Sequence, residues 1–95
     1  METVYTSHLE FRLKLRKIPY DLPRKIYQIA KERYYDDLTK HYVAVYKIEF
    51  KGKDRDMALV YDKRKDLDLA ELITIHPIKP YQKHSRINSG RWRKL

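Results

Sequence analysis

Apolar and polar side chains alternate most clearly in the middle of the chain. In residues 41–50, HYVAVYKIEF, successive side chains fall on opposite faces, and β-branched and aromatic residues are frequent, as is typical of a strand. Residues 57–61, MALVY, and residues 69–78, LAELITIHPI, have the same character, and the charged segments KGKDRD and DKRKD connect the three. Because short polar connections join antiparallel neighbours, the pattern predicts an antiparallel meander.

A helical pattern precedes these strands, in residues 21–37, DLPRKIYQIAKERYYDD. Asp21 occupies the N-cap position, and Pro23 lies in the first turn, where its missing N–H costs little. A stripe of side chains recurs at intervals of three and four residues, which gives a helix one packing face. The stripe consists of Leu22, Ile26, Ile29, Ala30 and Arg33, with Tyr27 and Tyr34 beside it.

The first segment, HLEFRLKLRKI at residues 8–18, carries two patterns at once. Every second residue from Leu9 to Leu15 is apolar, which favours a strand. Its Leu, Lys, Arg and Glu content favours a helix, and Ser7 could cap that helix. The pattern alone leaves both structures open.

Charge points to the kind of partner. The chain has 22 Lys and Arg against 13 Asp and Glu, a net charge of +9. This balance favours a polyanion, with nucleic acid first and an acidic protein second. Residues 79–95 contain no acidic residue but hold Trp92, the only tryptophan. We therefore predict one domain at residues 1–78 and a basic extension at residues 79–95, an extended appendage that becomes ordered by packing Trp92 or by binding.

The extension combines cations with aromatic rings, as surfaces that bind single-stranded nucleic acid do. The alternative is that Trp92 docks onto the sheet with the cations at its rim. For nucleic-acid contact we predict Arg16, Lys79, Tyr81, Lys83, Arg86, Arg91, Trp92 and Arg93.

Several classes of protein are disfavoured. There is no cysteine, no apolar run of the roughly 18–20 residues that span a membrane, and no signal peptide, so we expect a soluble, cytoplasmic protein. Only Gly52 and Gly90 are present, so there is no glycine-rich phosphate loop. The scattered aspartates fall in turns, and we predict neither a metal site nor a cofactor. Few Asn and Gln and 37% charged residues fit the amino-acid usage of a thermophile.

Two short motifs resemble a known family. His8, Arg12, Arg16 and Ile18 form the pattern H-x3-R-x3-R-x-I, and the third strand ends in I-T-I-H-P at residues 73–77. The chain thereby resembles small uncharacterised domains of the RelE/ParE-like toxin superfamily. The resemblance implies an α+β fold, with a short first strand and two N-terminal helices packed on an antiparallel three- to four-stranded sheet. It also implies that residues 8–17 are helical.

The same resemblance implies activities and partners. Many such toxins cleave RNA without a metal, others act on a topoisomerase, and an antitoxin neutralises them. For cleavage we predict His8, Arg12 and His76 as catalytic residues, close to Arg86, because cleavage needs proton-transfer groups and cations at the phosphate. Structural roles for these histidines, and a surface position for His41, are the alternative interpretations.

The function that we predict is RNA binding, with metal-independent endoribonuclease activity of toxin–antitoxin type and an acidic antitoxin-like partner. The alternative is a non-catalytic module that binds nucleic acid or an acidic protein. A toxin that inhibits a topoisomerase is the third interpretation.

Overall fold

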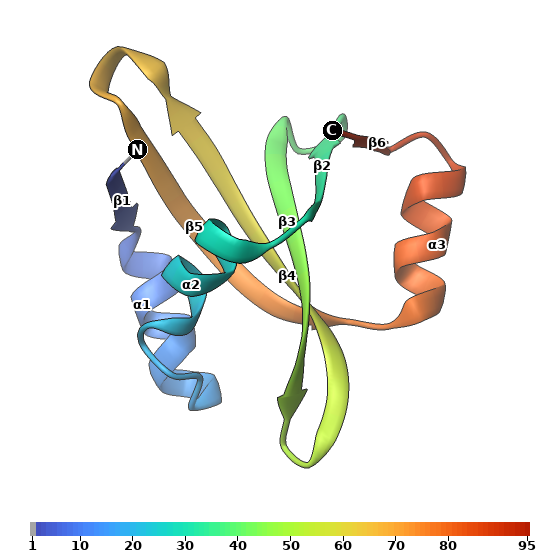
Figure 1. Cartoon of the computed structure of the whole chain (residues 1–95), viewed down its shortest axis with the longest axis horizontal. Coiled ribbons are helices and arrows are strands. Elements are labelled where there is room, and N and C mark those ends of the chain that lie inside the picture. The colour runs from blue at the N-terminus through green and yellow to red at the C-terminus, as the bar shows by residue number, and fades with distance from the viewer. Residues whose placement is uncertain (1) are drawn as a thin grey trace.

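The chain folds as an α+β structure with helices on both sides of one mixed sheet (Figure 1). The computed structural model describes residues 2–95. The six strands of this region run in the order β1-β5-β4-β3-β2-β6; β1 is parallel to β5, and all other neighbours are antiparallel. The elements are β1 (Glu2–Tyr5), α1 (Ser7–Arg16), α2 (Leu22–Ile29), β2 (Glu32–Asp36), β3 (His41–Phe50), β4 (Lys53–Arg64), the 3₁₀ turn η1 (Lys65–Leu67), β5 (Leu69–Ile78), α3 (Pro80–Asn88) and β6 (Trp92–Lys94).

The predicted meander is confirmed, but the sheet is larger than expected. β3 and β5 have the predicted bounds, whereas β4 extends beyond residues 57–61 at both ends. The expected sheet of three or four antiparallel strands is wrong, because β1, β2 and β6 join it and β1 is parallel. Strands of three to five residues show too little alternation to be recognised in a sequence, since long-range pairing determines them.

The ambiguous first segment is a helix, α1. Its N-cap is Thr6, not Ser7: the Thr6 hydroxyl accepts from the backbone N–H of Leu9 and donates to the carbonyl of Ile73 in β5. Leu9 and Leu13 are buried against the sheet, whereas Phe11 and Leu15 are 63% and 66% exposed. The apolar alternation in the sequence therefore arises because Phe11 and Leu15, which are exposed on α1, fall between and after the two buried leucines. None of the helices within residues 2–95 is long and apolar enough to cross a membrane.

The predicted helix at residues 21–37 is right only in its first half. α2 ends at Ile29, and Glu32–Asp36 form β2 between β3 and β6. Arg33 explains the early end, because it donates to the carbonyls of Tyr27 and Ala30 at the last turn of α2. Its guanidinium also donates to the hydroxyl of Tyr61. Asp21 precedes α2 as predicted, but its side chain makes no capping hydrogen bond.

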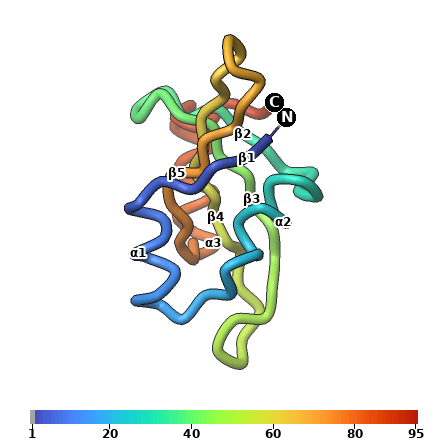
Figure 2. Tube along the Cα trace, turned by 90° about the vertical axis from the view of Figure 1, so that its left-hand side faces the viewer, coloured from blue at the N-terminus to red at the C-terminus, as the bar shows by residue number. Residues whose placement is uncertain are grey.

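Each face of the sheet carries its own core. α1 and α2 cover one face, and α3 with β6 covers part of the other; in Figure 2, α1 and α2 lie in front and α3 lies behind. The first core holds Leu9, Leu13, Ile18, Ile26, Ala30, Ala44, Met57, Leu59, Tyr61, Ala70, Leu72 and Ile75, and the second holds Tyr34, Val43, Val45, Ala58, Ile78 and Trp92.

A β-bulge in β5 decides which side chains face α3. Tyr61 of β4 pairs with Leu72, but its neighbour Val60 pairs with Thr74, so Ile73 is an extra residue. Leu72 consequently packs on the α1 side, whereas Thr74 and the residues at alternate positions after it face α3.

The basic extension is not an extended appendage. Residues 80–88 form α3, and β6 pairs with β2 at the edge of the sheet. Trp92 is 3% exposed and stacks on Tyr34 with ring centroids 5.2 Å apart. Docking of Trp92 onto the sheet, considered above as the alternative, is therefore what orders this region.

Candidate nucleic-acid interface

The α3 side of the sheet carries a cavity of about 260 Å³, which we call the basic pocket. β3, β4 and β5 form its floor, and residues of α3 and β6 form one wall. The β2–β3 turn lies at one end. The polar side chains that line it are Asp36, Thr39, His41, Thr74, His76, Arg86 and Arg91.

His76 lies in this pocket with an uncharged imidazole at neutral pH. Burial lowers the pKa of His76, and the positive charges of Arg86, Arg12 and Arg16 lower it further, to about 4. Within residues 2–95 no other side chain hydrogen-bonds the ring. A neutral imidazole can donate one hydrogen bond and accept one, so both ring nitrogens are available to a ligand.

The positive charges of three arginines act on His76, and of these only Arg86 lines the pocket. Arg86 comes from α3, where its guanidinium lies 5.3 Å from the centre of the Trp92 ring. Arg12 and Arg16 come from α1, which packs beside β5. β1 covers the edge of β5 only at residues 69–72. The edge beside His76 therefore carries no strand, and the charges of the α1 arginines act on His76 from that side. In the part of the chain that the structure describes, none of the three forms an ion pair.

Thr74 adds a buried donor to the same end of the pocket. Its hydroxyl oxygen is buried and has no hydrogen-bond partner among residues 2–95. Leaving such a group unsatisfied costs roughly 1–3 kcal/mol, and such atoms in native proteins call for an explanation such as a bound group. Thr74 lines the pocket two residues before His76.

The other end of the pocket holds carboxylates that are already paired. Asp36 accepts two hydrogen bonds from Arg91, each of 2.9 Å, and one of 3.2 Å from the Trp92 indole N–H. Burial alone would raise the pKa of Asp36, but these bonds and those from two backbone N–H groups lower it to about 2. His41 Nδ1 lies 2.9 Å from the carboxylate of Asp62. The pocket therefore holds the ionised carboxylate of Asp36 together with the cations Arg86 and Arg91, and Asp36 also acts electrostatically on Arg86.

The structure brings together only part of the predicted catalytic set. Of the residues predicted to lie near His76, Arg86 lines the pocket with it, and the charge of Arg12 acts on it from α1, as does that of Arg16. His8 lies one turn before Arg12 on the same helix, is exposed, and does not line the pocket. The histidine that sequence reasoning missed is His41, because its partner Asp62 lies 21 residues further along the chain.

The predicted contacts in the extension fall into two groups. Lys79 and Tyr81 are exposed at the start of α3, with the ammonium 6.0 Å from the ring centre. Lys83, Arg91 and Arg93 instead pair with carboxylates, at 2.8 Å from Glu32, 2.9 Å from Asp36 and 2.9 Å from Asp37 respectively. The six cations that looked unopposed in the sequence are thus partly matched by acidic residues of β2 and its turn.

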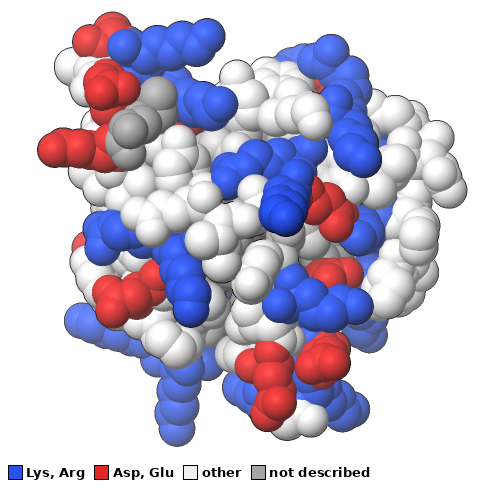
Figure 3. Space-filling model, in the orientation of Figure 1, with Lys and Arg blue, Asp and Glu red and all other residues white. Residues whose placement is uncertain are grey.

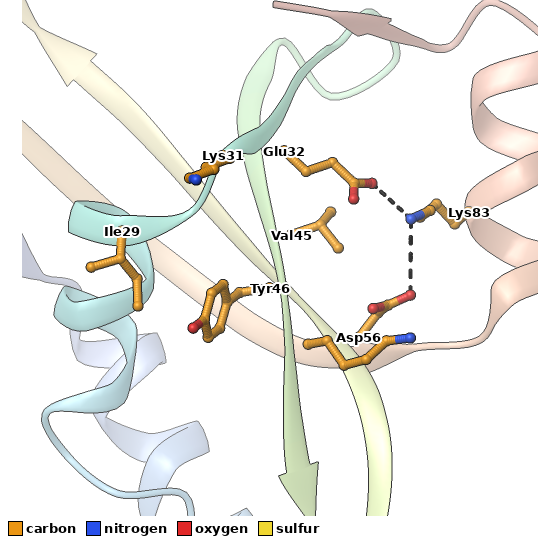
Figure 4. A pocket seen from close by; sticks show the side chains of 8 residues that line it. Ile29, Lys31, Glu32, Val45, Tyr46, Asp56 and Lys83 are labelled. Carbon is orange, nitrogen blue, oxygen red and sulfur yellow. Dashed lines mark ion pairs between the residues drawn. The ribbon is translucent and has the colours of Figure 1, made fainter.

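A larger cavity, of about 560 Å³, lies elsewhere, beside the free edge of β3 (Figure 4). There Lys83 reaches between Glu32 at 2.8 Å and Asp56 at 4.0 Å. Burial would raise the pKa of Glu32, but hydrogen bonds from Lys83 and Tyr34 lower it below its ordinary value. Figure 3 shows the same mixture of signs across this face of the molecule. Matched charges suit a polyanion less well than Arg86 of the basic pocket does, because Arg86 forms no ion pair within residues 2–95.

Within residues 2–95, no group of three or more His, Asp or Glu side chains is placed to hold a metal ion. Comparison with protein-family models, curated proteins and solved structures found no match to this chain.

Proposed function

We propose that the protein binds RNA and that a phosphate of the RNA occupies the basic pocket beside Arg86. The observation that carries this proposal is that Arg86, which forms no ion pair within residues 2–95, lines one pocket together with an uncharged His76. Arg12 and Arg16 of α1 add positive charge that also acts on His76. Arginine presents a planar fork of donors that matches phosphate oxygens. The net charge of +9 would attract the polyanion from a distance.

Bases would contact the surface around α3. Tyr81 is 66% exposed and has no packing role, so its ring is free to stack on an unpaired base. Trp92 has a different part in this proposal. It is buried, and it positions the Arg86 guanidinium instead of touching RNA.

Membership in the RelE/ParE-like superfamily is part of the proposal. Three observations support it: residues 8–17 lie almost entirely within a helix, His8, Arg12 and Arg16 are spaced along one side of that helix, and two N-terminal helices pack on one face of a sheet. β1 matches the short first strand of the expected architecture, but its parallel pairing with β5 and the C-terminal α3 and β6 go beyond it. An acidic antitoxin-like protein is the partner that this membership would imply.

The second candidate function is metal-independent cleavage of RNA. It is favoured by His41, which lines the same pocket as His76 and is oriented by Asp62. One imidazole would take the proton of a 2′-hydroxyl, and the other would protonate the leaving 5′-oxygen while Arg86 stabilises the phosphorane. The strand register argues against cleavage. His41 lies beside Asp62 and His76 pairs with Ala58, and these two residues of β4 are about 13 Å apart along the strand. Binding is therefore the better supported function.

The test compares single-stranded RNA binding by the wild type, Arg86→Gln and the control Arg64→Gln. Arg64 is 53% exposed in the side chain and lies at the end of β4, so this control makes the same charge change outside the pocket. We expect a loss of roughly 10- to 100-fold for Arg86→Gln only, as for a charge-assisted hydrogen bond. No binding at low salt, or equal losses in both variants, would refute the proposal.

Cleavage is tested on the same samples in the presence of EDTA. A product that ends in a 2′,3′-cyclic phosphate, and that disappears in His76→Gln, would support the second candidate. If the RNA is bound but stays intact, the cleavage candidate fails and RNA binding remains the proposed function.

A further inference from the structure

We infer that the protein forms a symmetric dimer through the free edge of β3, where residues 46–50 pair antiparallel with the same residues of a second copy. The inference follows from the unpaired edge, from the self-complementary sequence of this segment, and from the space beside it. None of residues 46–50 lines the basic pocket, so the dimer is independent of the proposed RNA binding.

Residues 46–50 of β3 have a strand on one side only. β2 begins at Glu32, opposite Val45, and the chain before it leads to α2, whereas β4 pairs with β3 as far as Phe50. At the bottom of Figure 1 the β3–β4 hairpin extends past α1 and α2. An edge of this kind presents backbone donors and acceptors that can pair with another strand.

The turn between β3 and β4 determines which backbone groups face the free edge. Residues 51–52 have φ values of 53° and 79° and form a two-residue turn, so the flanking Phe50 and Lys53 pair through their backbone groups. Alternate residues of an antiparallel strand direct these groups to opposite edges. Those of Lys47 and Glu49 therefore point away from β4, toward the free edge.

The sequence of this edge, YKIEF, is complementary to itself when two copies run antiparallel. With Ile48 opposite Ile48 of the second copy, Lys47 lies opposite Glu49 and Tyr46 lies opposite Phe50, and each pair occurs twice. Opposite charges and apolar rings directly across two strands stabilise their pairing. Moving the axis to Lys47 or to Glu49 would set like charges opposite each other, so the sequence specifies one register.

The two charged side chains of the edge lack ion-pair partners in a single chain. Lys47 and Glu49 are exposed, and neither forms an ion pair within residues 2–95. On its paired side Glu49 lies opposite Asp54 of β4, which is a second carboxylate. Lys47 of the second copy would supply the positive charge that this position lacks.

The apolar side chains of the edge would continue the first core across the dimer. Ile48 and Phe50 are half-buried against that core, and Tyr46 is 37% exposed. All three lie on the side of the sheet that α1 and α2 cover, because they alternate with Lys47 and Glu49. Symmetric pairing would bring the two sets together on that side and remove them from water.

The cavity of about 560 Å³ leaves room for the turn of the second copy. Ile29, Val45 and Tyr46 are among the residues that line it (Figure 4). Because Phe50 of the second copy would lie opposite Tyr46, its turn at residues 51–52 would reach the point where β2 begins. The cavity lies at that point.

The other edges of the sheet are less suited to a second strand. β1 and β6 have only four and three residues, and the part of β5 that β1 leaves uncovered contains Pro77, which has no N–H. Short strands and prolines are the usual protection of an edge. Residues 46–50 contain no proline and pair with β4 without a bulge.

The experiment measures the mass of the full chain by sedimentation velocity over a concentration series, after nuclease treatment so that RNA cannot bridge two copies. Five paired residues make a small interface, so we expect a dimer that dissociates at roughly micromolar concentrations. Lys47→Glu and Glu49→Lys should each weaken the dimer about tenfold, because each sets like charges opposite each other. Lys65→Glu makes the same charge change in η1 and should dimerise like the wild type.

Mixing the two variants gives the decisive result. In a mixed dimer both glutamates of the Lys47→Glu chain lie opposite lysines of the Glu49→Lys chain, so the mixture should regain the wild-type affinity. One chain that carries both changes should regain it as well. Circular dichroism of each variant checks that it is folded.

Three results would overturn the inference. The first is a wild type that stays monomeric throughout the series. The second is a dimer that Lys47→Glu and Glu49→Lys form as readily as the wild type does. The third is a loss of the dimer in both variants that neither the mixture nor the doubly changed chain restores.

Discussion

Arg91 donates two hydrogen bonds of 2.9 Å to the two carboxylate oxygens of Asp36, which lies 55 residues earlier in the chain. Asp36 ends β2 and Arg91 precedes β6, so this pair fixes the C-terminal strand at the edge of the sheet. The pair also forms the carboxylate end of the basic pocket. One contact thus serves both the fold and the charge distribution of the candidate site.

We expect Asp36→Asn to lower the free energy of unfolding by about 2–4 kcal/mol, because Arg91 would lose its partner in a buried setting. Urea unfolding followed by the fluorescence of Trp92 measures this. The control is Asp37→Asn, whose partner Arg93 is 63% exposed, and it should cost less than about 1 kcal/mol. An equal loss in the free energy of unfolding for the two variants would show that the buried Asp36–Arg91 pair stabilises the fold no more than the exposed Asp37–Arg93 pair does.

The free energy of unfolding should fall in two steps as the pH is lowered. The pKa of His76 is lowered from 6.5 to about 4, so between these values the unfolded chain binds the extra proton and stability is lost as the pH falls. The pKa of Asp36 is lowered from 3.8 to about 2, so its contribution is present above pH 3.8 and is lost below. Urea unfolding in a pH series should show both steps, and His76→Gln should flatten only the upper one.

Two threonines should respond in opposite directions to replacement by valine. Thr74→Val removes a buried hydroxyl that has no partner, and we expect the free energy of unfolding to rise by about 1 kcal/mol. Thr6→Val removes the N-cap of α1 and the bond to Ile73, and should lower it by about 1–2 kcal/mol. Thermal unfolding of both variants tests this. A Thr74→Val variant as destabilised as Thr6→Val would mean that the Thr74 hydroxyl contributes to the fold.

The salt dependence of RNA binding should separate unpaired cations from paired ones. Removing one phosphate contact lowers the log–log slope by about 0.7 for a single strand. We expect this reduction for Arg86→Gln and for Arg12→Gln, and no reduction for Lys83→Gln, since Lys83 already pairs with Glu32. Affinities between 50 and 300 mM salt, roughly the range over which such slopes are read, provide the measurement. Equal slopes in all three variants would place the RNA outside the basic pocket.

The sequence predicted those elements in which apolar side chains recur at the period of the strand. The alternation of residues predicted β3 and β5, and the resemblance motif predicted that residues 8–17 are helical. β2 was missed because Tyr34 also fits a helical stripe, and only the contacts of Arg33 with the end of α2 explain why the helix stops. Pairing over long sequence distances cannot be read from either pattern.

The candidate site was predictable in its residue types but not in its pairing. Arg12, His76 and Arg86 were named from composition and motif; His76 and Arg86 line one pocket, and the charge of Arg12 acts on His76 from α1. Sequence reasoning could not distinguish Arg86 from Arg91, because the partner that neutralises Arg91 lies in β2. The carboxylates that match half of the basic extension are all more than 20 residues away from it.

The single extra residue in β5 lets this strand lose one residue without losing the site. Without Ile73, regular pairing would carry on from Tyr61 and Leu72 to Val60 and Thr74, and His76 would still pair with Ala58 on the α3 side. If all residues were kept but paired without the bulge, the imidazole would instead point into the core under α1, and the apolar side chain of Ile75 would replace it in the pocket. A one-residue deletion at position 73 should therefore leave the site in place, whereas a slip of the strand by one residue would remove it while leaving every one of its side chains in the sequence. Homologues that share this site should keep either the bulge or a strand that is one residue shorter between Leu72 and Thr74.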